Sequence, residues 1–388
     1  YILAFSRLIC KLSYFPLPRW KVLNGLRKGA LGCLATILIY NIIYMKTLVF
    51  TGGHHTGALE VAKMLKDKGW SIVWFGHKHS MWNDTSHSSE YKEVTEENIE
   101  FHDLLAGKFH KTYNPLKLIR IPWGFLQAFF LLLKTRPSGI VSFGGYLAVP
   151  TVITGWILGI PSITHEQTIT QGWANKLISK FVKKVAVTWP ESMKNYDNKA
   201  VLIGLPLRKE ILEAKKNILK KPLLFITGGK QGAHVINDTV FSALLNIKYD
   251  ILHQTGNNSE YGDFDKAKKI NLPNYKGVDF LNAKEQAQAL IDADVVVSRA
   301  GAHAVYELGF LKKKCVLIPI PWVSHNEQYK NAQILEKAGM AVILNQNQLT
   351  SENLLLAINQ ASKLEPKKLS MIIDASQRMV KLCEEYFG

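Results

Sequence analysis

The sequence predicts an α/β protein with two doubly wound, Rossmann-like domains that face a cleft, preceded by a basic and apolar N-terminal extension. A chain of 388 residues is too long for one ordinary core and fits two domains of typical size. Short apolar runs alternate with segments of helical period through both halves, which is typical of parallel sheets. Three of these runs end in a pair of glycines before a helix start, an arrangement that suits phosphate.

The domain boundaries are placed where the composition changes. A charge-rich stretch between the two alternating halves indicates a linker, and an amphipathic helix, predicted from 369 to 387, ends the chain. The predicted order is an extension at 1–44, a first domain at 45–208, a linker at 209–221, a second domain at 222–364 and a C-terminal helix at 365–388.

The composition indicates a globular protein that seeks anionic partners. Hydrophobic residues make up 47% of the chain and charged residues 20%, which excludes a disordered protein. The net charge is +17, but the basic residues are spread and match no nucleic-acid module, so we favour an anionic lipid or a diphosphate over nucleic acid. The four cysteines have no paired spacing, so they predict neither a disulfide framework nor a zinc site and indicate a reducing, cytoplasmic setting.

The extension at 1–44 contains six basic residues and no acidic one, and the segment 29–45 carries no charge. Its 17 residues stand at the short edge of what crosses a bilayer. Two interpretations stay open. Either the natural domain starts near Met45 and the extension is not native, or the extension is a membrane-seeking tail.

The first glycine turn carries the candidates for a catalytic base. The strand predicted at 47–50 leads to Gly52 and Gly53, and a helix follows. His54 and His55 stand at the turn, where a neutral imidazole can take a proton from an attacking hydroxyl. One of the two is expected merely to cap the helix, and the residues alone do not say which.

After a strand predicted at 71–76, the histidine-rich stretch 77–110 is expected to be loop and weak helix. An apolar run at 128–133 follows, with Trp123 before it and basic residues at both ends. This run predicts either a core helix or a helix that lies on a membrane surface.

A second glycine turn follows in the same half, where the strand predicted at 140–143 leads to Gly144, Gly145 and Tyr146. Two such turns in one domain make a chance match to a phosphate loop less credible.

A polar cluster then follows the apolar run at 161–164. We interpret His165 as a positioning residue, and Glu166 as a residue that orients a substrate or the catalytic histidine, with Thr168 beside them. Arg208 closes the domain and is placed to meet a donor phosphate.

The third glycine turn opens the second domain, after a strand predicted at 223–226. It contains Gly229, Lys230 and Gln231, and the lysine either adds positive charge against a diphosphate or points to solvent. The alternation then predicts strands at 251–254 and 278–281 and a helix at 283–292.

The most informative stretch follows a strand predicted at 295–297. Ala302, His303 and Ala304 open a helix whose unpaired N–H groups suit phosphate. Glu307, one to two turns further, can accept both hydroxyls of a ribose. The stretch therefore predicts a nucleotide-sugar pocket at the carboxyl ends of parallel strands.

Gln328 and Asn331 are three residues apart and share one helix face, where neutral amides suit sugar hydroxyls better than a metal. A plain polar helix face is the alternative. The order of Ala-Gly-Ala and Glu307, then Gln328-Tyr329 and Asn331-Ala332, resembles the donor half of MurG-type N-acetylglucosaminyltransferases of the family 28 type.

The resemblance covers about Met45 to the end of the chain and implies a GT-B architecture that uses neither a metal nor a cofactor. It implies that N-acetylglucosamine moves with inversion from UDP-N-acetylglucosamine to lipid I, an undecaprenyl-linked acceptor, to form lipid II for peptidoglycan. It also implies a peripheral protein on the cytoplasmic face of an anionic cell membrane.

The same resemblance implies roles for single residues. His54 aligns with the family's base, in a loop about three residues shorter than usual, and His55 remains a candidate. The family has serine where Lys230 stands and asparagine where Thr168 stands. The glycine turns Gly52-Gly53 and Gly144-Gly145-Tyr146 receive the acceptor diphosphate, and the last helix returns to the first domain.

Two alternatives remain. A UDP-N-acetylglucosamine 2-epimerase shares the fold but needs no lipid-facing helix. A non-catalytic lipid-binding homologue would explain the shortened first loop.

Overall fold

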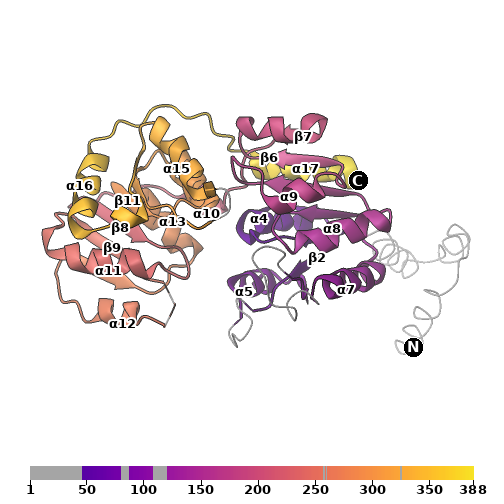
Figure 1. Cartoon of the computed structure of the whole chain (residues 1–388), viewed down its shortest axis with the longest axis horizontal. Coiled ribbons are helices and arrows are strands. Elements are labelled where there is room, and N and C mark those ends of the chain that lie inside the picture. The colour runs from indigo at the N-terminus through magenta and orange to yellow at the C-terminus, as the bar shows by residue number, and fades with distance from the viewer. Residues whose placement is uncertain (1–45, 80–86, 108–119, 257, 259, 324–325) are drawn as a thin grey trace, which may run out of the picture. The chain divides into compact units, whose positions relative to one another are not determined.

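The computed structural model describes residues 46–79, 87–107, 120–256, 258, 260–323 and 326–388. The predicted extension at 1–44 lies outside these residues, so neither interpretation of it is tested. Two separate parallel sheets follow each other along the described chain (Figure 1).

The first sheet has seven parallel strands in the order β3-β2-β1-β4-β5-β6-β7. The strands are β1 (Thr47–Thr51), β2 (Ser71–Gly76), β3 (Glu100–Asp103), β4 (Gly139–Ser142), β5 (Ser162–Glu166), β6 (Lys184–Val187) and β7 (Ala200–Leu202). The helices of this domain are α4 (His55–Asp67), α5 (Ser89–Glu96), α7 (Arg120–Thr135), α8 (Ala148–Ile157) and α9 (Trp173–Ile178).

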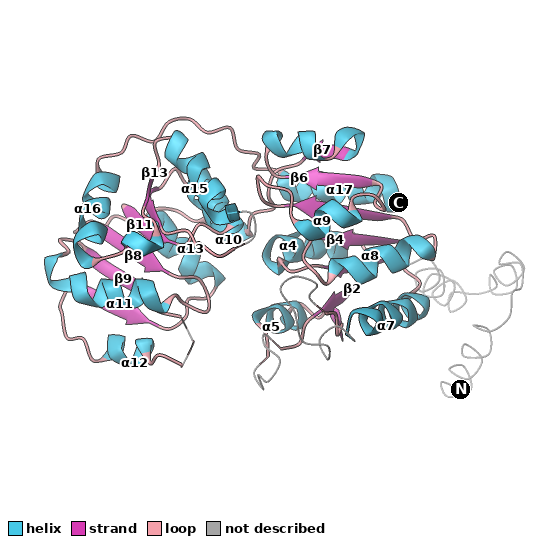
Figure 2. Cartoon of the chain, viewed as in Figure 1, coloured by secondary structure: helices cyan, strands magenta, loops and turns pink. Residues whose placement is uncertain are grey.

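The second sheet has six parallel strands in the order β10-β9-β8-β11-β12-β13. Figure 2 labels β8, β9, β11 and β13 of this sheet. The strands are β8 (Leu223–Thr227), β9 (Asp250–Gln254), β10 (Tyr275–Val278), β11 (Val295–Ser298), β12 (Lys314–Leu317) and β13 (Ala341–Ile343). The helices are α10 (Lys209–Glu213), α11 (His234–Ala243), α12 (Asp263–Lys268), α13 (Ala283–Asp292), α14 (Ala302–Phe310), α15 (Glu327–Lys337), α16 (Ser351–Ser362) and α17 (Ala375–Phe387).

Each sheet separates two hydrophobic cores, because successive side chains of a strand point to opposite faces. In β1, Leu48 and Phe50 belong to the core beneath α4, whereas Val49 belongs to the core beneath α7 and α8. In β8, Phe225 and Ile226 divide in the same way between two cores. Strands buried on both faces read as continuous apolar runs, which is why the sequence located them. The predicted two-domain parallel α/β fold is confirmed.

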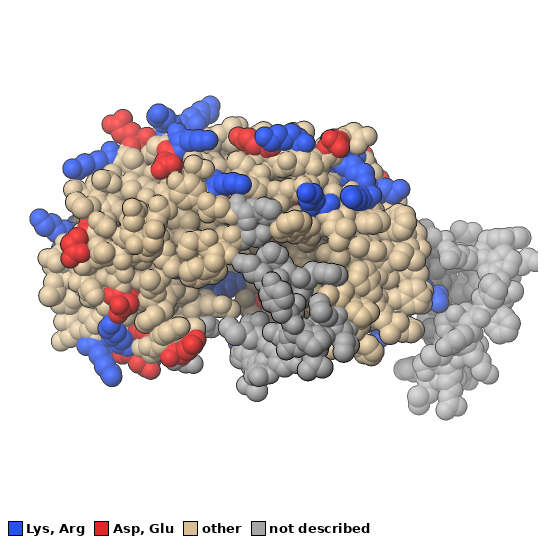
Figure 3. All heavy atoms as spheres, viewed as in Figure 1, with Lys and Arg blue, Asp and Glu red and all other residues tan. Residues whose placement is uncertain are grey.

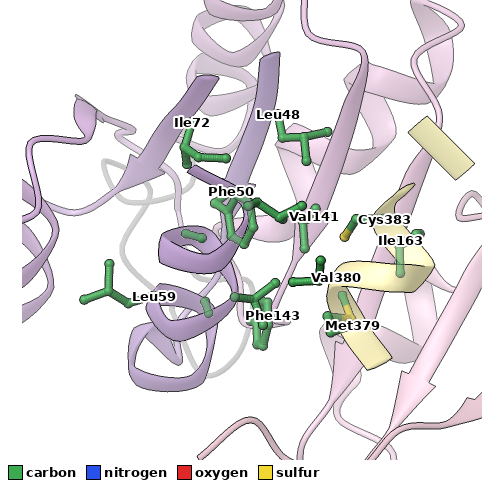
Figure 4. Packing of buried hydrophobic residues seen from close by; sticks show 14 of the residues in the cluster. Leu48, Phe50, Leu59, Ile72, Val141, Phe143, Ile163, Met379, Val380 and Cys383 are labelled. Atoms are coloured by element: carbon green, nitrogen blue, oxygen red, sulfur yellow. The ribbon is translucent and has the colours of Figure 1, made fainter. Parts of the chain in front are cut away.

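The last helix, α17, packs on the first domain although it follows the second along the chain. Met379 and Cys383 are fully buried in the same core as Ile163 (Figure 4). At the start of β4, a Cβ added to Gly139 would lie 2.3 Å from Cδ1 of Phe387, so glycine makes room for the end of the helix. The C-terminus is thus part of the first domain's core.

Three predicted elements were wrong in detail. The strand predicted at 278–281 is β10, which ends at Val278, since Phe280 lines a cavity instead of the sheet. The helix predicted at 369–387 begins only at Ala375, because Leu369 packs against the second domain's core ahead of it. The stretch 77–110 contains β3, a four-residue edge strand in which Phe101 is the only apolar residue, so it lacks the apolar alternation that reveals strands.

Candidate functional site

The first two glycine turns lie against each other at the carboxyl ends of β1 and β4. The backbone N–H of Gly53 donates to the carbonyl of Gly144 at 3.1 Å. Gly52 has φ +138°, and a Cβ there would lie 2.8 Å from the backbone of Phe143. Gly145 has φ +75°, and its Cβ would lie 2.9 Å from the Gly53 nitrogen. Only glycine fits this approach, which brings both turns to one place.

The two candidate histidines point to different surroundings. His54 is the N-cap of α4 and lines a cavity of about 800 Å³. Part of the His54 side chain is open to that cavity. Desolvation by the protein around it is the first cause that lowers the pKa of His54 below 6.5, and the charge of His55 is the second. His55 is instead paired with α5, because its Nε2 lies 3.1 Å from Oε2 of Glu93. His54 is therefore the imidazole that faces the cavity in neutral form.

This first cavity brings together many of the predicted acceptor-side residues. It has mainly apolar walls from α7, α8 and α9, including Phe125 and Trp173. The predicted residues that line it are His54, Gly144, Gly145, Tyr146, His165, Glu166 and Thr168.

Glu166 is a buried carboxylate whose oxygens are already engaged by the protein. Its Oε2 accepts from the Tyr196 hydroxyl at 2.6 Å, from the Gly172 N–H at 3.0 Å and from Asn175 Nδ2 at 3.1 Å. Its Oε1 accepts from the Thr168 hydroxyl at 3.2 Å. These hydrogen bonds tie Glu166 to the loop between β5 and α9 beside the cavity.

His165 is a second buried group in the wall of this cavity. Its Nε2 donates to the carbonyl of Gly204 at 2.8 Å, and its ring stacks on Phe143 with a centroid distance of 5.2 Å. Burial is the main cause that lowers the pKa of His165 to about 4. A neutral, stacked imidazole supports the positioning role that the sequence predicted.

Arg208 and Glu307 form a buried ion pair. Arg208 donates from Nε at 3.0 Å and from Nη2 at 2.8 Å to Oε1 of Glu307, and from Nη1 to Oε1 of Gln286 at 3.1 Å. The side chains of the pair are 10% and 5% exposed. Burial raises the pKa of Glu307, and Arg208 acts against that change. Two residues predicted to bind phosphate and ribose are here bound to each other.

The start of α14 approaches the start of α4. Gly301 is the N-cap of α14 and has no side chain to accept from the first-turn N–H groups, which belong to Ala302, His303 and Ala304. A Cβ added to Gly57 of α4 would lie 3.1 Å from Cε1 of His303. Burial, followed by the charges of His54 and Arg208, lowers the pKa of His303 well below 6.5.

The predicted sugar-contacting amides both hydrogen-bond to backbone groups of nearby loops. Gln328 Oε1 accepts from the Ile320 N–H at 3.1 Å. Asn331 is 1% exposed and donates from Nδ2 to the carbonyl of Ala300 at 3.4 Å. Its Oδ1 is buried and finds no partner within the described part of the chain. Gln328 thus supports the loop between β12 and α15, and Asn331 supports the loop before α14.

The third glycine turn borders a second, more polar cavity of about 990 Å³. Arg208, Lys230 and Gln231 are the predicted donor residues that line it. Gly229 has φ +88° and bends the chain ahead of α11, whose N-cap Ala233 has no side-chain acceptor. Lys230 donates from Nζ to Oε1 of Glu93 on α5.

Sequence reasoning missed several lining residues. Glu93 lies in a polar helix that offers no motif, and only its contacts reveal it. Phe280 lines the second cavity, although its apolar neighbourhood predicts a strand. Gln286 lies on the correctly predicted helix 283–292, where its meeting with Arg208 could not be foreseen.

Among the described residues, no group of three histidine, cysteine or acidic side chains is arranged to hold a metal ion. No described helix is both long and apolar enough to cross a bilayer. On the face drawn in Figure 3, the visible basic side chains lie dispersed among acidic ones.

Comparison with known families identifies the architecture. Residues 48–187 match the glycosyltransferase family 28 N-terminal domain, and residues 223–385 match its C-terminal domain. The chain belongs to glycosyltransferase family 28. The family predicted from the sequence is confirmed.

Curated family 28 relatives are similar over most of their length. A UDP-N-acetylglucosamine--N-acetylmuramyl-(pentapeptide) pyrophosphoryl-undecaprenol N-acetylglucosamine transferase of Clostridium kluyveri is 34% identical over 371 residues, covering 88% of this chain and 100% of the relative. The Clostridium botulinum protein of the same name is 35% identical over 339 residues, 81% of this chain and 90% of the relative.

Solved structures share the two-domain fold of family 28. MurG of Acinetobacter baumannii has a TM-score of 0.62 at 24% identity, over 88% of this chain and 99% of that one. The UDP-GlcNAc 2-epimerase of Neisseria meningitidis bound to UDP-GlcNAc has a TM-score of 0.60 at 14% identity. The match covers 88% of this chain and 100% of the epimerase chain. At these identities both likenesses show the fold alone.

Proposed function

We propose that this family 28 chain transfers N-acetylglucosamine from UDP-N-acetylglucosamine to lipid I, an undecaprenyl-linked muramoylpentapeptide acceptor, and so forms lipid II for peptidoglycan. The observation that carries the proposal is the position of His54, which faces a largely apolar cavity beside two glycine turns. The names of the curated relatives support the same donor and acceptor.

In the proposed reaction His54 is the general base. A histidine with a lowered pKa is neutral near pH 7 and can take the proton of the acceptor hydroxyl. The hydroxyl oxygen then attacks the anomeric carbon as the bond from that carbon to UDP breaks, with inversion. The turns at Gly52-Gly53 and Gly144-Gly145 offer backbone N–H groups to the acceptor diphosphate.

The leaving diphosphate of UDP carries the charge that the second domain has to stabilise. The start of α14 and the third glycine turn provide N–H groups, and Lys230 provides a cation. Arg208 is bound to Glu307 without donor, so donor binding exchanges this contact for the phosphate and the ribose.

We place the protein at the cytoplasmic face of an anionic cell membrane as a peripheral enzyme. Helix α7 supports this, because Trp123 is 55% exposed and Phe130 61% exposed on the same element that contributes Phe125 to the cavity. Exposed aromatic residues on a helix next to an apolar cavity suit a lipid-linked acceptor.

The deciding experiment measures UDP release from UDP-N-acetylglucosamine with and without a lipid I analogue. Release that requires the analogue and yields the disaccharide product supports the proposal. Free N-acetylmannosamine and UDP without acceptor would indicate an epimerase, and donor binding without any UDP release would indicate a non-catalytic homologue.

A further inference from the structure

One ion pair between α5 and the third glycine turn is not used in the proposed reaction. Lys230 Nζ contacts Oε1 of Glu93, and the two side chains are 32% and 31% exposed. The other oxygen of the same carboxylate, Oε2, lies 3.1 Å from His55 Nε2. The Glu93 carboxylate therefore contacts both the Lys230 ammonium of the third glycine turn and the His55 imidazole beside the first glycine turn.

The turn that carries Lys230 has the features of an anion site. Gly229 and Gly232 have φ +88° and +82°, and the Gly229 N–H is held by the Thr227 hydroxyl at 3.0 Å. Ala233 is the N-cap of α11 and has no side chain that could accept from the helix's first N–H groups. A helix start of this kind beside a lysine attracts negative charge. In this structure the negative charge that Lys230 contacts belongs to the protein itself.

The surroundings of Glu93 keep its carboxylate ionised, while water reaches its contact with Lys230. Burial by itself would raise the pKa of Glu93, but His55 and Lys230 lower it to about 2, so the group is ionised near pH 7. The pair with Lys230 is partly open to water, which screens it and keeps its strength low. A diphosphate offers Lys230 more charge and more acceptor oxygens than one carboxylate does.

We infer that Glu93 is a placeholder for the donor diphosphate: its carboxylate holds Lys230 until UDP arrives, and Lys230 then moves from Glu93 to the phosphate oxygens. Glu93 keeps its contact with His55 and acts through Lys230, so it is a positioning residue and not a catalytic one. The inference rests on the proposed function, because it needs a nucleotide diphosphate as the donor.

Calorimetry with UDP and with uridine on the full chain tests the exchange. Glu93→Gln keeps the size of the side chain and removes the competing charge. UDP should then bind about two- to fivefold tighter, the range expected for a partly exposed pair, while uridine binds as before. Lys230→Met should weaken binding of UDP but not of uridine, and it should abolish the gain when combined with Glu93→Gln.

Glu96→Gln is the matched control, because it removes an exposed carboxylate one turn further along α5. It should change the UDP affinity less than Glu93→Gln does. Unchanged uridine binding shows that each variant is folded. An unchanged or weaker UDP affinity in Glu93→Gln, or the same gain in the Lys230→Met background, overturns the inference alone. A wild-type chain that binds neither ligand overturns the proposed function with it.

Discussion

Arg208 donates two hydrogen bonds to one oxygen of Glu307, from Nε at 3.0 Å and from Nη2 at 2.8 Å, inside a nearly closed environment. The guanidinium and the carboxylate come from positions 99 residues apart in sequence. Each satisfies a charge that would otherwise be buried alone. The pair thus contributes to the stability of the fold as well as to the proposed donor site.

Arg208→Met should therefore destabilise the protein by about 3–5 kcal/mol, because it leaves the Glu307 carboxylate buried without its partner. The free energy of unfolding in urea measures this loss. The double variant Arg208→Met/Glu307→Met should lose much less than the sum of the single variants, because neither charge remains. Additive losses would mean that the two side chains do not stabilise each other.

His54→Ala should lower the rate of sugar transfer by about 10²–10⁴-fold, the usual loss when a general base is removed. His55→Ala is the control, since His55 faces Glu93 and not the cavity, and it should lower the rate far less. Both rates come from the UDP-release assay at saturating acceptor. A larger loss in His55→Ala would transfer the role of base to that residue.

The pH profile of the transfer rate should show an acidic limb below pH 6.5. The pKa of His54 is lowered by the surrounding protein and by His55, so the imidazole stays neutral until the pH falls below its ordinary value. As the pH falls through that lowered pKa, the base becomes protonated and the rate declines. A limb centred above pH 7 in the wild-type chain would contradict this assignment.

Gly52→Ala should cost more stability than Gly53→Ala. At Gly52 the φ of +138° strains any side chain, and its Cβ would lie 2.8 Å from the backbone of Phe143. The strained position should cost about 1–3 kcal/mol. At Gly53 the nearest atom to the added Cβ is 3.8 Å away, an ordinary contact. Thermal unfolding of both variants compares them, and equal losses would argue against the close approach of the two turns.

The stability of the protein should fall as the pH drops from 6.5, partly through His253. Burial lowers the pKa of His253 to about 3, so the folded state keeps it neutral while the unfolded state takes up a proton. The contribution of neutral His253 to the free energy of unfolding is complete above pH 6.5 and is lost as the pH falls toward 3. One such proton gives a slope of up to about 1.4 kcal/mol per pH unit.

Urea unfolding between pH 6.5 and pH 4 measures that slope. His253→Gln should flatten it, whereas Tyr275→Phe should lower stability at every pH with the slope retained, because it removes only the hydroxyl partner at 3.0 Å. Parallel curves for His253→Gln and the wild type would contradict the role given to this imidazole.

The fold was predictable from sequence because its strands are buried on both faces. The run from Val295 to Val297 and the helix at 283–292 are continuous or periodic signals that need no tertiary information. The edge strand β3 gives no such signal, since Phe101 is its only apolar residue and its pairing with β2 defines it. Phe280 and Leu369 caused the opposite error. Both are apolar and were predicted to lie in a strand and a helix, but β10 ends before Phe280 and α17 begins after Leu369.

The candidate site was predictable as a set of turns but not as a set of contacts. Glycine pairs before helices mark places where a chain turns sharply, and Gly52 and Gly144 do meet. The partner of Arg208 and the different surroundings of His54 and His55 depend on side-chain directions. Glu93 has no sequence motif, so the sequence could not indicate its two contacts.

Because Met379 and Cys383 are buried in the core of the first domain, that domain cannot complete its fold early during synthesis on the ribosome. Synthesis runs from the N-terminus, so the first domain leaves the ribosome early but lacks one wall of its core until the final helix is released. The second domain has its whole sheet available before that moment. We therefore expect the domain that is made first to be completed last.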